Sequence, residues 1–269
     1  MIIDFHTHVF PEKIAERTIE RLSQMGGIPA FADGTRAGLL RAMEEADVRI
    51  SINLPVLTKP EQFESVNAFS AEINQAFEGK ERRIISFGAI HPACPNIKEK
   101  MRWLRDNGFL GVKLHPDYQG TYIDDDGYVQ ILRAAAENGL IAVTHAGIDV
   151  GYKDQPVHCP PERALKLIRK VPYSGFVLAH YGAAEMPEEV LSTIAGENVY
   201  LDTAYILRFI GEDDFKRILD RHGENRVLFA SDSPWSSMKK DIQILRSFGL
   251  GKTTEEKILS GNAKALLGL

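Results

Sequence analysis

The sequence contains only two cysteines, Cys94 and Cys159, which lie far apart in no spacing typical of a metal-binding motif. Apolar runs long enough to cross a membrane are absent. Asp4 and two histidines also interrupt the first apolar segment before it reaches the length of a signal peptide. These absences argue against a disulfide framework and a membrane-spanning protein, and they favour a reduced, cytoplasmic setting.

An excess of basic residues is missing as well. Lys and Arg number 32 against 37 Asp and Glu, which gives a formal net charge of −5. Because the sequence has no basic stripe, we expect a small-molecule substrate as the partner, with no nucleic acid and no membrane. The hydrophobic share of 44% over 269 residues is enough for a sizeable core. The oligomeric state stays open, a homo-oligomer included.

Short β-branched runs alternate with helical patterns along the whole chain. The first predicted strand lies within residues 1–10 and ends at Pro11, because proline cannot donate to a sheet. The other seven predicted strands cover residues 48–55, 82–92, 109–116, 139–147, 174–182, 198–204 and 225–234. Each is followed by a helical pattern, which implies βαβ units and a parallel sheet.

The number of strands and the length of the chain favour a closed barrel. We predict an α/β fold, a single (β/α)₈ TIM barrel that spans residues 1–269 as one domain, with an insertion after the first strand. An open doubly wound sheet is the alternative, but no glycine-rich phosphate-binding motif follows the first strand. The insertion covers the long connection 11–34, which serves either as a lid or pocket wall or as a structural element.

The stretch FHTH places two histidines in the first strand. His6 and His8 are two positions apart, so they face the same side of a strand with their Cα atoms roughly 7 Å apart. Six of the eight histidines fall at the predicted ends of strands. They are His6, His8, His91, His115, His145 and His180. Asp232 holds the matching position after the last strand.

In a parallel barrel the carboxyl ends of the strands meet on one rim, where catalytic residues lie. His6, His8, His145, His180 and Asp232 are therefore expected to converge there. Their nitrogen and oxygen atoms suit a divalent metal, zinc in the first place and also manganese or iron. The sequence thus predicts a metal site at the rim, with one or two ions.

This pattern resembles the amidohydrolase superfamily along essentially the whole chain. The resemblance is carried by HTH in the first strand, VTHAG around His145, LAHYG around His180 and ASDSP around Asp232. The DFHTHVFP opening and the SDSPW ending are most similar to the branch described as predicted metal-dependent hydrolases of TIM-barrel fold. That branch also includes the aminocarboxymuconate-semialdehyde decarboxylase type.

The resemblance implies roles for these residues. His6, His8 and His145 bind metal, and Asp232 binds metal and handles protons. His180 is either a ligand of a second ion or a catalytic base beside a single ion. Lys113 in KLHP is similar to a carboxylated lysine that bridges two ions in many superfamily members. The alternative for Lys113 is a partner for a substrate anion, and the two readings stay open.

Weaker candidates lie at the same rim. His115 shares the face of Lys113 and either contacts substrate or hydrogen-bonds to the loop. Arg208 either binds a substrate carboxylate or is a surface charge on a helix. Trp235 either walls the pocket or packs against neighbouring loops.

Two reactions fit these parts. The leading prediction is hydrolysis of a small C–N or C–O substrate (an amide, lactone or ester) by metal-activated water, whose pKa falls from 15.7 towards about 7. Asp232 would move the proton, and Lys113 or His180 would polarise the carbonyl. The alternative is metal-dependent non-oxidative decarboxylation of a small carboxylic acid, with His180 managing protonation of a carbon. A catalytically silent barrel is the third reading, and the complete ligand set argues against it.

Overall fold

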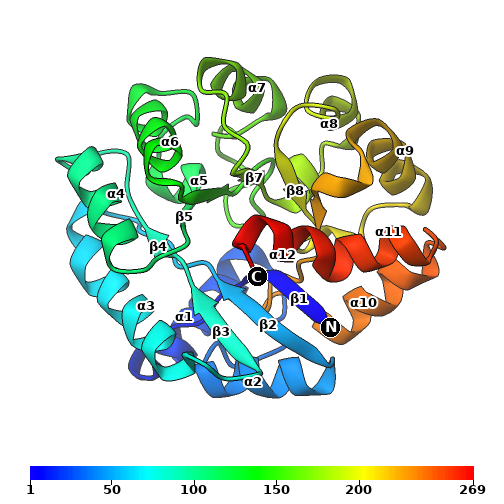
Figure 1. The fold of residues 1–269 in the computed structure, drawn as a ribbon, viewed down its shortest axis with the longest axis horizontal. Helices are drawn as coiled ribbons and strands as arrows, with labels where there is room; N and C mark the ends of the chain where they lie inside the picture. Colours follow the sequence, from blue (N-terminus) through cyan, green and yellow to red (C-terminus); the bar gives the residue numbers. More distant parts are fainter.

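The computed structural model describes residues 1–269 and forms a ring of parallel strands surrounded by helices (Figure 1). One sheet has the order β1-β2-β3 and the other β4-β5-β6-β7-β8-β9, with every neighbouring pair parallel. The strands are β1 Ile2–Thr7, β2 Val48–Asn53, β3 Arg83–Ser86, β4 Gly88–Ala89, β5 Gly111–Leu114, β6 Ile141–Thr144, β7 Phe176–Leu178, β8 Tyr200–Asp202 and β9 Val227–Leu228. The predicted α/β barrel is confirmed.

Hydrogen bonds join the two sheets at both seams, so the barrel is closed. Only Phe87 separates β3 from β4, and its N–H donates to Asn53 O at 2.9 Å, which makes these two pieces one position in the ring. At the other seam the Phe5 N–H donates to Phe229 O, and the Asp232 N–H donates to His6 O, both at 2.9 Å. The nine labelled strands therefore fill eight positions, as a (β/α)₈ barrel requires.

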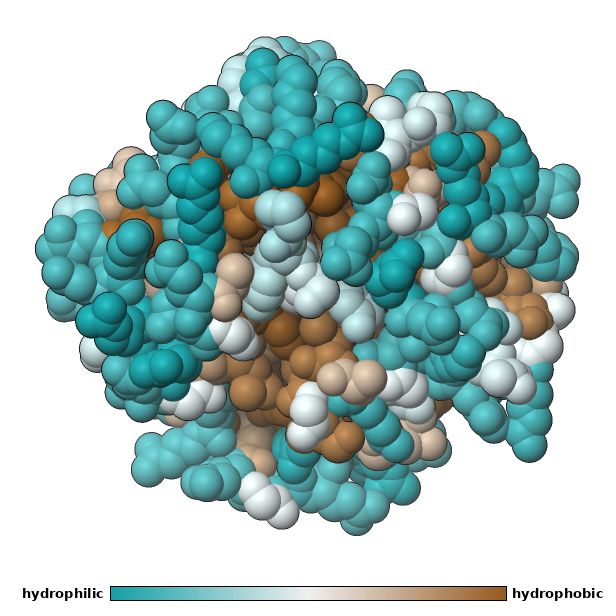
Figure 2. Space-filling model, turned by 45° about the horizontal axis from the view of Figure 1, so that its top comes forward, coloured by the Kyte–Doolittle hydropathy of each residue, from teal (hydrophilic) through white to brown (hydrophobic).

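Most of the helices cover the outside of the ring. The helices are α1 Glu12–Gly26, α2 Arg36–Glu45, α3 Phe63–Phe77, α4 Ile97–Asp106, α5 Pro116–Gln119, α6 Asp126–Asn138, α7 Pro161–Lys170, α8 Pro187–Thr193, α9 Glu212–His222, α10 Met238–Ser247, α11 Lys252–Glu256 and α12 Asn262–Leu267. Figure 2 shows hydrophilic residues over the outer helices and hydrophobic residues in the hollows between them. None of these helices combines the length and the apolar character that a bilayer span needs.

The core has two parts of different size. A cluster of 55 buried residues lies between the strands and the helices, whereas a cluster of 14 fills the inside of the barrel. Ala263 and Leu267 of α12 belong to the inner cluster and pack among strand residues such as Ile3 and Leu228. In Figure 1, α12 accordingly crosses the centre of the ring. It closes the end of the barrel opposite the histidines.

An irregularity in β1 directs the two histidines of FHTH. Ile3 and Phe5 point into the barrel, and strict alternation would send His6 to the outside. The pairing of β1 with β2 shifts register between Asp4 and Thr7, which is the mark of a bulge. His6 therefore joins the inner side as well, and it is 1% exposed.

Candidate active site

Three of the predicted metal ligands meet at the rim. His6 Nε2 lies 3.2 Å from His8 Nε2 and 3.4 Å from Asp232 Oδ1, and His8 Nε2 lies 3.1 Å from the same oxygen. Two ligands of one ion, each about 2.1 Å from it, lie roughly 3–3.5 Å apart at tetrahedral or octahedral angles. The separations within this group, the metal triad, suit a single divalent ion.

The outer nitrogens of the two rings also favour metal binding. His6 Nδ1 donates to Asp202 Oδ2 at 2.9 Å, and His8 Nδ1 donates to Leu54 O at 2.8 Å. In the neutral rings this leaves a lone pair on each Nε2, directed at the other ring and at the carboxylate of Asp232. Lys113 Nζ lies 3.0 Å from His6 Nε2, and the remaining lone pair and the anionic oxygen can share this space only around a proton or a bound cation. A metal-binding histidine usually donates a hydrogen bond from the ring nitrogen that does not bind the metal, as both rings do here.

Electrostatics decide between the proton and the cation. Burial, followed by the charge of Lys113, lowers the pKa of His6 well below its ordinary value, which disfavours a proton on this ring. Burial works to raise the pKa of Asp232, but the hydrogen bond from His8 and the charges of the histidines, which these rings supply when they are protonated, outweigh it and lower this pKa to about 2. Asp232 is therefore ionised at neutral pH, and the residues of the triad fit a metal ion.

Two side chains of the site stand on strained backbone. His180 has φ 57° and Asp232 has φ 67°, the left-handed region that residues other than glycine rarely adopt. The Asp232 N–H is held by His6 O, and the His180 N–H donates to Asp202 Oδ1 at 3.1 Å. These bonds stabilise conformations that cost about 1–3 kcal/mol each and that are typical of functional sites.

His145 and His180 form a pair beside the triad. His180 Nε2 lies 2.9 Å from His145 Nδ1, and His180 Nδ1 donates to Ala204 O at 3.0 Å. The ring centres of His180 and His6 are 5.5 Å apart. The nitrogens of His145 cluster with His115 and Asp149 and not with the triad. Metal binding by His145 and His180 stays a prediction.

Lys113 is buried deep in the barrel. Its Nζ lies 3.0 Å from His6 Nε2, and its side chain is 1% exposed. Burial lowers the pKa of Lys113 to about 8, although the carboxylates of Asp202 and Asp232 oppose this shift. The lysine is thus close enough to the triad either to bridge two ions after carboxylation or to meet an anion.

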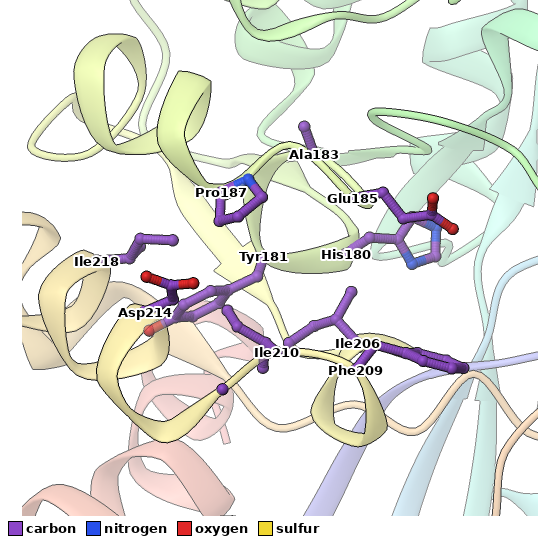
Figure 3. Close-up of a pocket in the computed structure, with 11 residues that line it drawn as sticks. His180, Tyr181, Ala183, Glu185, Pro187, Ile206, Phe209, Ile210, Asp214 and Ile218 are labelled. Atoms are coloured by element: carbon purple, nitrogen blue, oxygen red, sulfur yellow. The ribbon is translucent and has the colours of Figure 1, made fainter.

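A cavity of about 110 Å³ opens beside His180. Apolar side chains line most of it, among them Ile206 and Phe209. In Figure 3, His180 and Glu185 lie on one side of this space, and Asp214 lies on the other. His180 is therefore the residue that connects the metal triad with room for an apolar molecule.

Arg208 lies among aromatic rings near the rim. Its guanidinium carbon is 5.2 Å from the ring centre of Phe31, 5.0 Å from that of Tyr205 and 5.1 Å from that of Phe209. Its Nη2 donates to Trp235 O at 3.1 Å. Phe31 belongs to the 11–34 connection, so that segment reaches this position. The contact with Trp235 uses the backbone carbonyl and not the indole.

Two acidic residues near the pair were not among the sequence candidates. Asp149 Oδ2 lies 3.3 Å from His115 Nε2, and Asp117 Oδ2 lies 3.7 Å from His145 Nε2. Asp117 follows the fourth predicted strand in HPDY, and Asp149 comes four residues after His145. The positions of Asp117 and Asp149 just past strand ends could have marked them as residues of the rim. Loop residues follow no periodic pattern, however, so the sequence does not predict where their side chains point.

The chain matches the model of the amidohydrolase family over residues 3–269, and it therefore belongs to this family. The resemblance proposed from the HTH, VTHAG, LAHYG and ASDSP motifs is confirmed. A comparison with curated proteins finds no match.

Solved structures share the fold over nearly the whole chain. An uncharacterised TIM-barrel protein from Bordetella bronchiseptica is 20% identical, with a TM-score of 0.76 and coverage of 99% of this chain and 98% of that one. A 5-carboxyvanillate decarboxylase from Sphingomonas paucimobilis is 14% identical, with a TM-score of 0.69 and coverage of 100% and 99%. A dihydroxybenzoic acid decarboxylase from Polaromonas, solved with bound manganese, is 16% identical, with a TM-score of 0.73 and coverage of 100% and 97%.

The leading prediction of hydrolysis is wrong. Most of the similar structures whose activity is given are decarboxylases of aromatic acids, which agrees with the alternative reaction and not with hydrolysis. The histidine and aspartate motifs indicate a metal site but not its reaction, because the same kind of metal site serves several reactions on the same barrel. Residues of the loops, which follow no motif, select between them.

Proposed function

We propose that this protein is a metal-dependent non-oxidative decarboxylase of a small aromatic carboxylic acid. The observation that carries the proposal is the position of His180. The imidazole stands next to the triad, and the residue also lines the apolar cavity, so a small molecule bound there would lie close to both. The decarboxylase neighbours support the proposal.

His6, His8 and Asp232 would hold the metal ion. Manganese is our first choice because two of the decarboxylase neighbours contain it, and zinc suits the same ligands. When bound, the ion supplies positive charge that orients an anionic substrate and stabilises the negative charge left as CO₂ departs. Asp202 keeps His6 in the tautomer that such binding requires.

Two cations would bind the substrate carboxylate. Lys113 supplies a charge next to the triad, and its burial makes an electrostatic contact stronger than it would be in water. Arg208 lies within cation–π distance of three aromatic rings and donates to Trp235 O, and these contacts would position its other nitrogens for a carboxylate. In this proposal Trp235 positions Arg208, and His115 orients a loop carboxylate.

His180 would supply the proton that replaces CO₂. The bond between the ring carbon and the carboxylate carbon breaks, its electron pair stays on the ring carbon, and protonated His180 gives the Nε2 proton to that carbon. Solvent then returns one proton to His180. The hydrogen bond from Nδ1 to Ala204 O holds the ring in the required direction throughout.

The test is a panel of hydroxylated benzoic acids incubated with the manganese-loaded protein, with CO₂ release and phenol formation measured together. We expect one or more members to react, and His180→Asn to lower kcat about 10²–10⁴-fold. In deuterated water the product should carry one deuterium at the vacated carbon. The matched control is His222→Gln, a buried histidine on α9 outside the site, which should keep full activity. Release of CO₂ at an equal rate by the His180 variant would overturn the proposal.

A further inference from the structure

Phe31 is an aromatic residue that is half exposed yet held in a defined place. It is 43% exposed. The Phe31 N–H donates to Pro234 O at 2.7 Å, and close to it in sequence Gly34 O accepts from the Phe10 N–H at 2.8 Å. Hydrogen bonds therefore fix the end of the 11–34 connection. A ring that stays so exposed gains little from burial, so its fixed position calls for another explanation.

The hydrogen bond of Phe31 brings the connection to the loop that carries Asp232. Pro234 O accepts from Phe31, and the next carbonyl, Trp235 O, accepts from Arg208 Nη2 at 3.1 Å. The Trp235 N–H in turn donates to Asp232 O at 2.8 Å. Phe31 and Arg208 are thus bound to adjacent residues of the loop that begins at the metal triad.

The ring of Phe31 also contacts the guanidinium of Arg208. The guanidinium carbon lies 5.2 Å from the ring centre, within the range of a cation–π contact. Tyr205 and Phe209 make similar contacts, but they flank the same short turn, η3 Ile206–Arg208, and so belong to the segment of the arginine itself. Phe31 is the ring that ties the guanidinium to a different part of the chain.

The charge of Arg208 is compensated only in part within the protein. Arg36 pairs with Glu12 at 2.9 Å, whereas Arg208 forms no ion pair, and its Nε is buried without a hydrogen-bond partner. Asp241 on α10 feels the charge of Arg208, but burial is the larger influence and raises the pKa of Asp241 to about 7. The guanidinium therefore keeps unused donors and positive charge for an anionic ligand.

We propose that Phe31 is a positioning residue, which holds the Arg208 guanidinium in the orientation in which it binds a carboxylate. The inference rests on the role of Arg208 in the proposed function. The aromatic ring attracts the cation, and the backbone hydrogen bond to Pro234 keeps the ring in place. The 11–34 connection then takes part in the site by supporting the arginine, and Phe31 acts on the substrate only through Arg208.

Ligand binding measured by calorimetry tests the proposal without turnover. The probes are benzoate, an anion, and benzamide, a neutral molecule of similar shape, each titrated into the manganese-loaded protein. Phe31→Ala should weaken benzoate binding about 3–10-fold, the scale of one cation–π contact, and should leave benzamide binding unchanged. Phe31→Tyr keeps an aromatic ring and should bind benzoate as the wild type does. The matched control is Ile14→Ala on α1, because Ile14 is 40% exposed in the same connection.

A double variant shows whether Phe31 acts through Arg208. Arg208→Gln alone should weaken benzoate binding, and the addition of Phe31→Ala should cause no further loss. Circular dichroism before each titration shows that the variants are folded, and Phe31→Leu, which keeps apolar volume without a π face, replaces Phe31→Ala if the latter unfolds. The proposal is overturned if the Phe31 variant binds benzoate as tightly as the wild type, if benzamide binding weakens equally, or if the double variant shows a full further loss.

Kinetics separate this inference from the proposed reaction. With any hydroxybenzoate that reacts, Phe31→Ala should raise KM by the factor seen for benzoate, while kcat stays within about twofold of the wild-type value, because the ring affects binding and not proton delivery. A protein that shows the expected benzoate affinities but releases no CO₂ contradicts the proposed function and leaves the role of Phe31 standing. A protein that releases CO₂ with the same KM and benzoate affinity in Phe31→Ala contradicts the role of Phe31 alone.

Discussion

One end of the barrel is closed by apolar side chains, whereas the other end carries polar and ionisable side chains. At one end α12 inserts Ala263 and Leu267 among the apolar residues of the strands. At the other end the strands end in histidines and carboxylates, and His180 and Asp232 stand on left-handed backbone. The first end gains stability from apolar burial. The second end carries buried polar groups and strained conformations, which a barrel accepts where it performs chemistry.

This difference means that changes at the two ends should separate stability from activity. The largest effect is expected at the polar end. His8→Ala removes one Nε2 lone pair from the triad, so bound metal should fall and activity should drop about 10³-fold or more, since several kcal/mol of charge stabilisation are lost. Elemental analysis and kcat on one preparation check this prediction. Full metal occupancy in the variant would remove His8 from the ligand set.

At the apolar end, Leu267→Ala should lower stability and leave the metal site intact. Leu267 is 7% exposed and belongs to the inner cluster, so its truncation should lower the free energy of unfolding by about 2–4 kcal/mol while metal content stays unchanged. Urea unfolding measures the loss. Leu269→Ala is the matched control, because that side chain is 51% exposed. Equal effects of the two changes would contradict the role given to α12.

A pH titration tests the apolar end in a different way. His222, beside Val199 at the start of β8, has its pKa lowered to about 4, chiefly by burial. The unfolded chain, with a pKa near 6.5, binds the proton first, so this contribution is complete above pH 6.5 and is lost as pH falls towards 4. The loss should amount to about 3 kcal/mol. His222→Gln should make the free energy of unfolding depend less on pH between 4 and 6.5. An unchanged slope would show that His222 is not the source of this dependence.

The smallest effect concerns the partner of His6. Asp202→Asn keeps an oxygen but can present an amide N–H to His6 Nδ1, which would shift the hydrogen of that ring to Nε2. Metal affinity should fall about 10–100-fold while the fold persists. Titration of the stripped protein with Mn²⁺ measures it. Wild-type affinity in the variant would show that Asp202 does not control the tautomer.

The strands and their order could be read from the sequence because barrel strands repeat a simple pattern. LIAVT and RVLFA are apolar throughout, and each precedes a helical pattern. The clustering of histidines at strand ends then located the rim. The convergence of His6, His8 and Asp232 needed no more than these two facts, because the carboxyl ends of parallel strands meet on one side.

Other features depended on contacts between distant segments. The strand predicted over 174–182 covers only Phe176–Leu178, because the left-handed backbone at His180 turns the chain out of the sheet. The bulge in β1 depends on pairing with β2, which periodicity does not reveal. Asp117 and Asp149 lie in irregular segments, where direction is set by neighbours such as His158 and Gly151.

The seam between β1 and β9 has a consequence for the order in which the protein matures. The triad joins residues 6 and 8 to residue 232, and the Asp232 N–H donates to His6 O across this seam. A growing chain carries its first two ligands from the start but lacks the third until most of its length has been synthesised. The newborn protein therefore cannot complete the triad during most of its translation. With the metal ion proposed above, metal binding and closure of the ring would be one late event, in which the ion would join the first strand to the last.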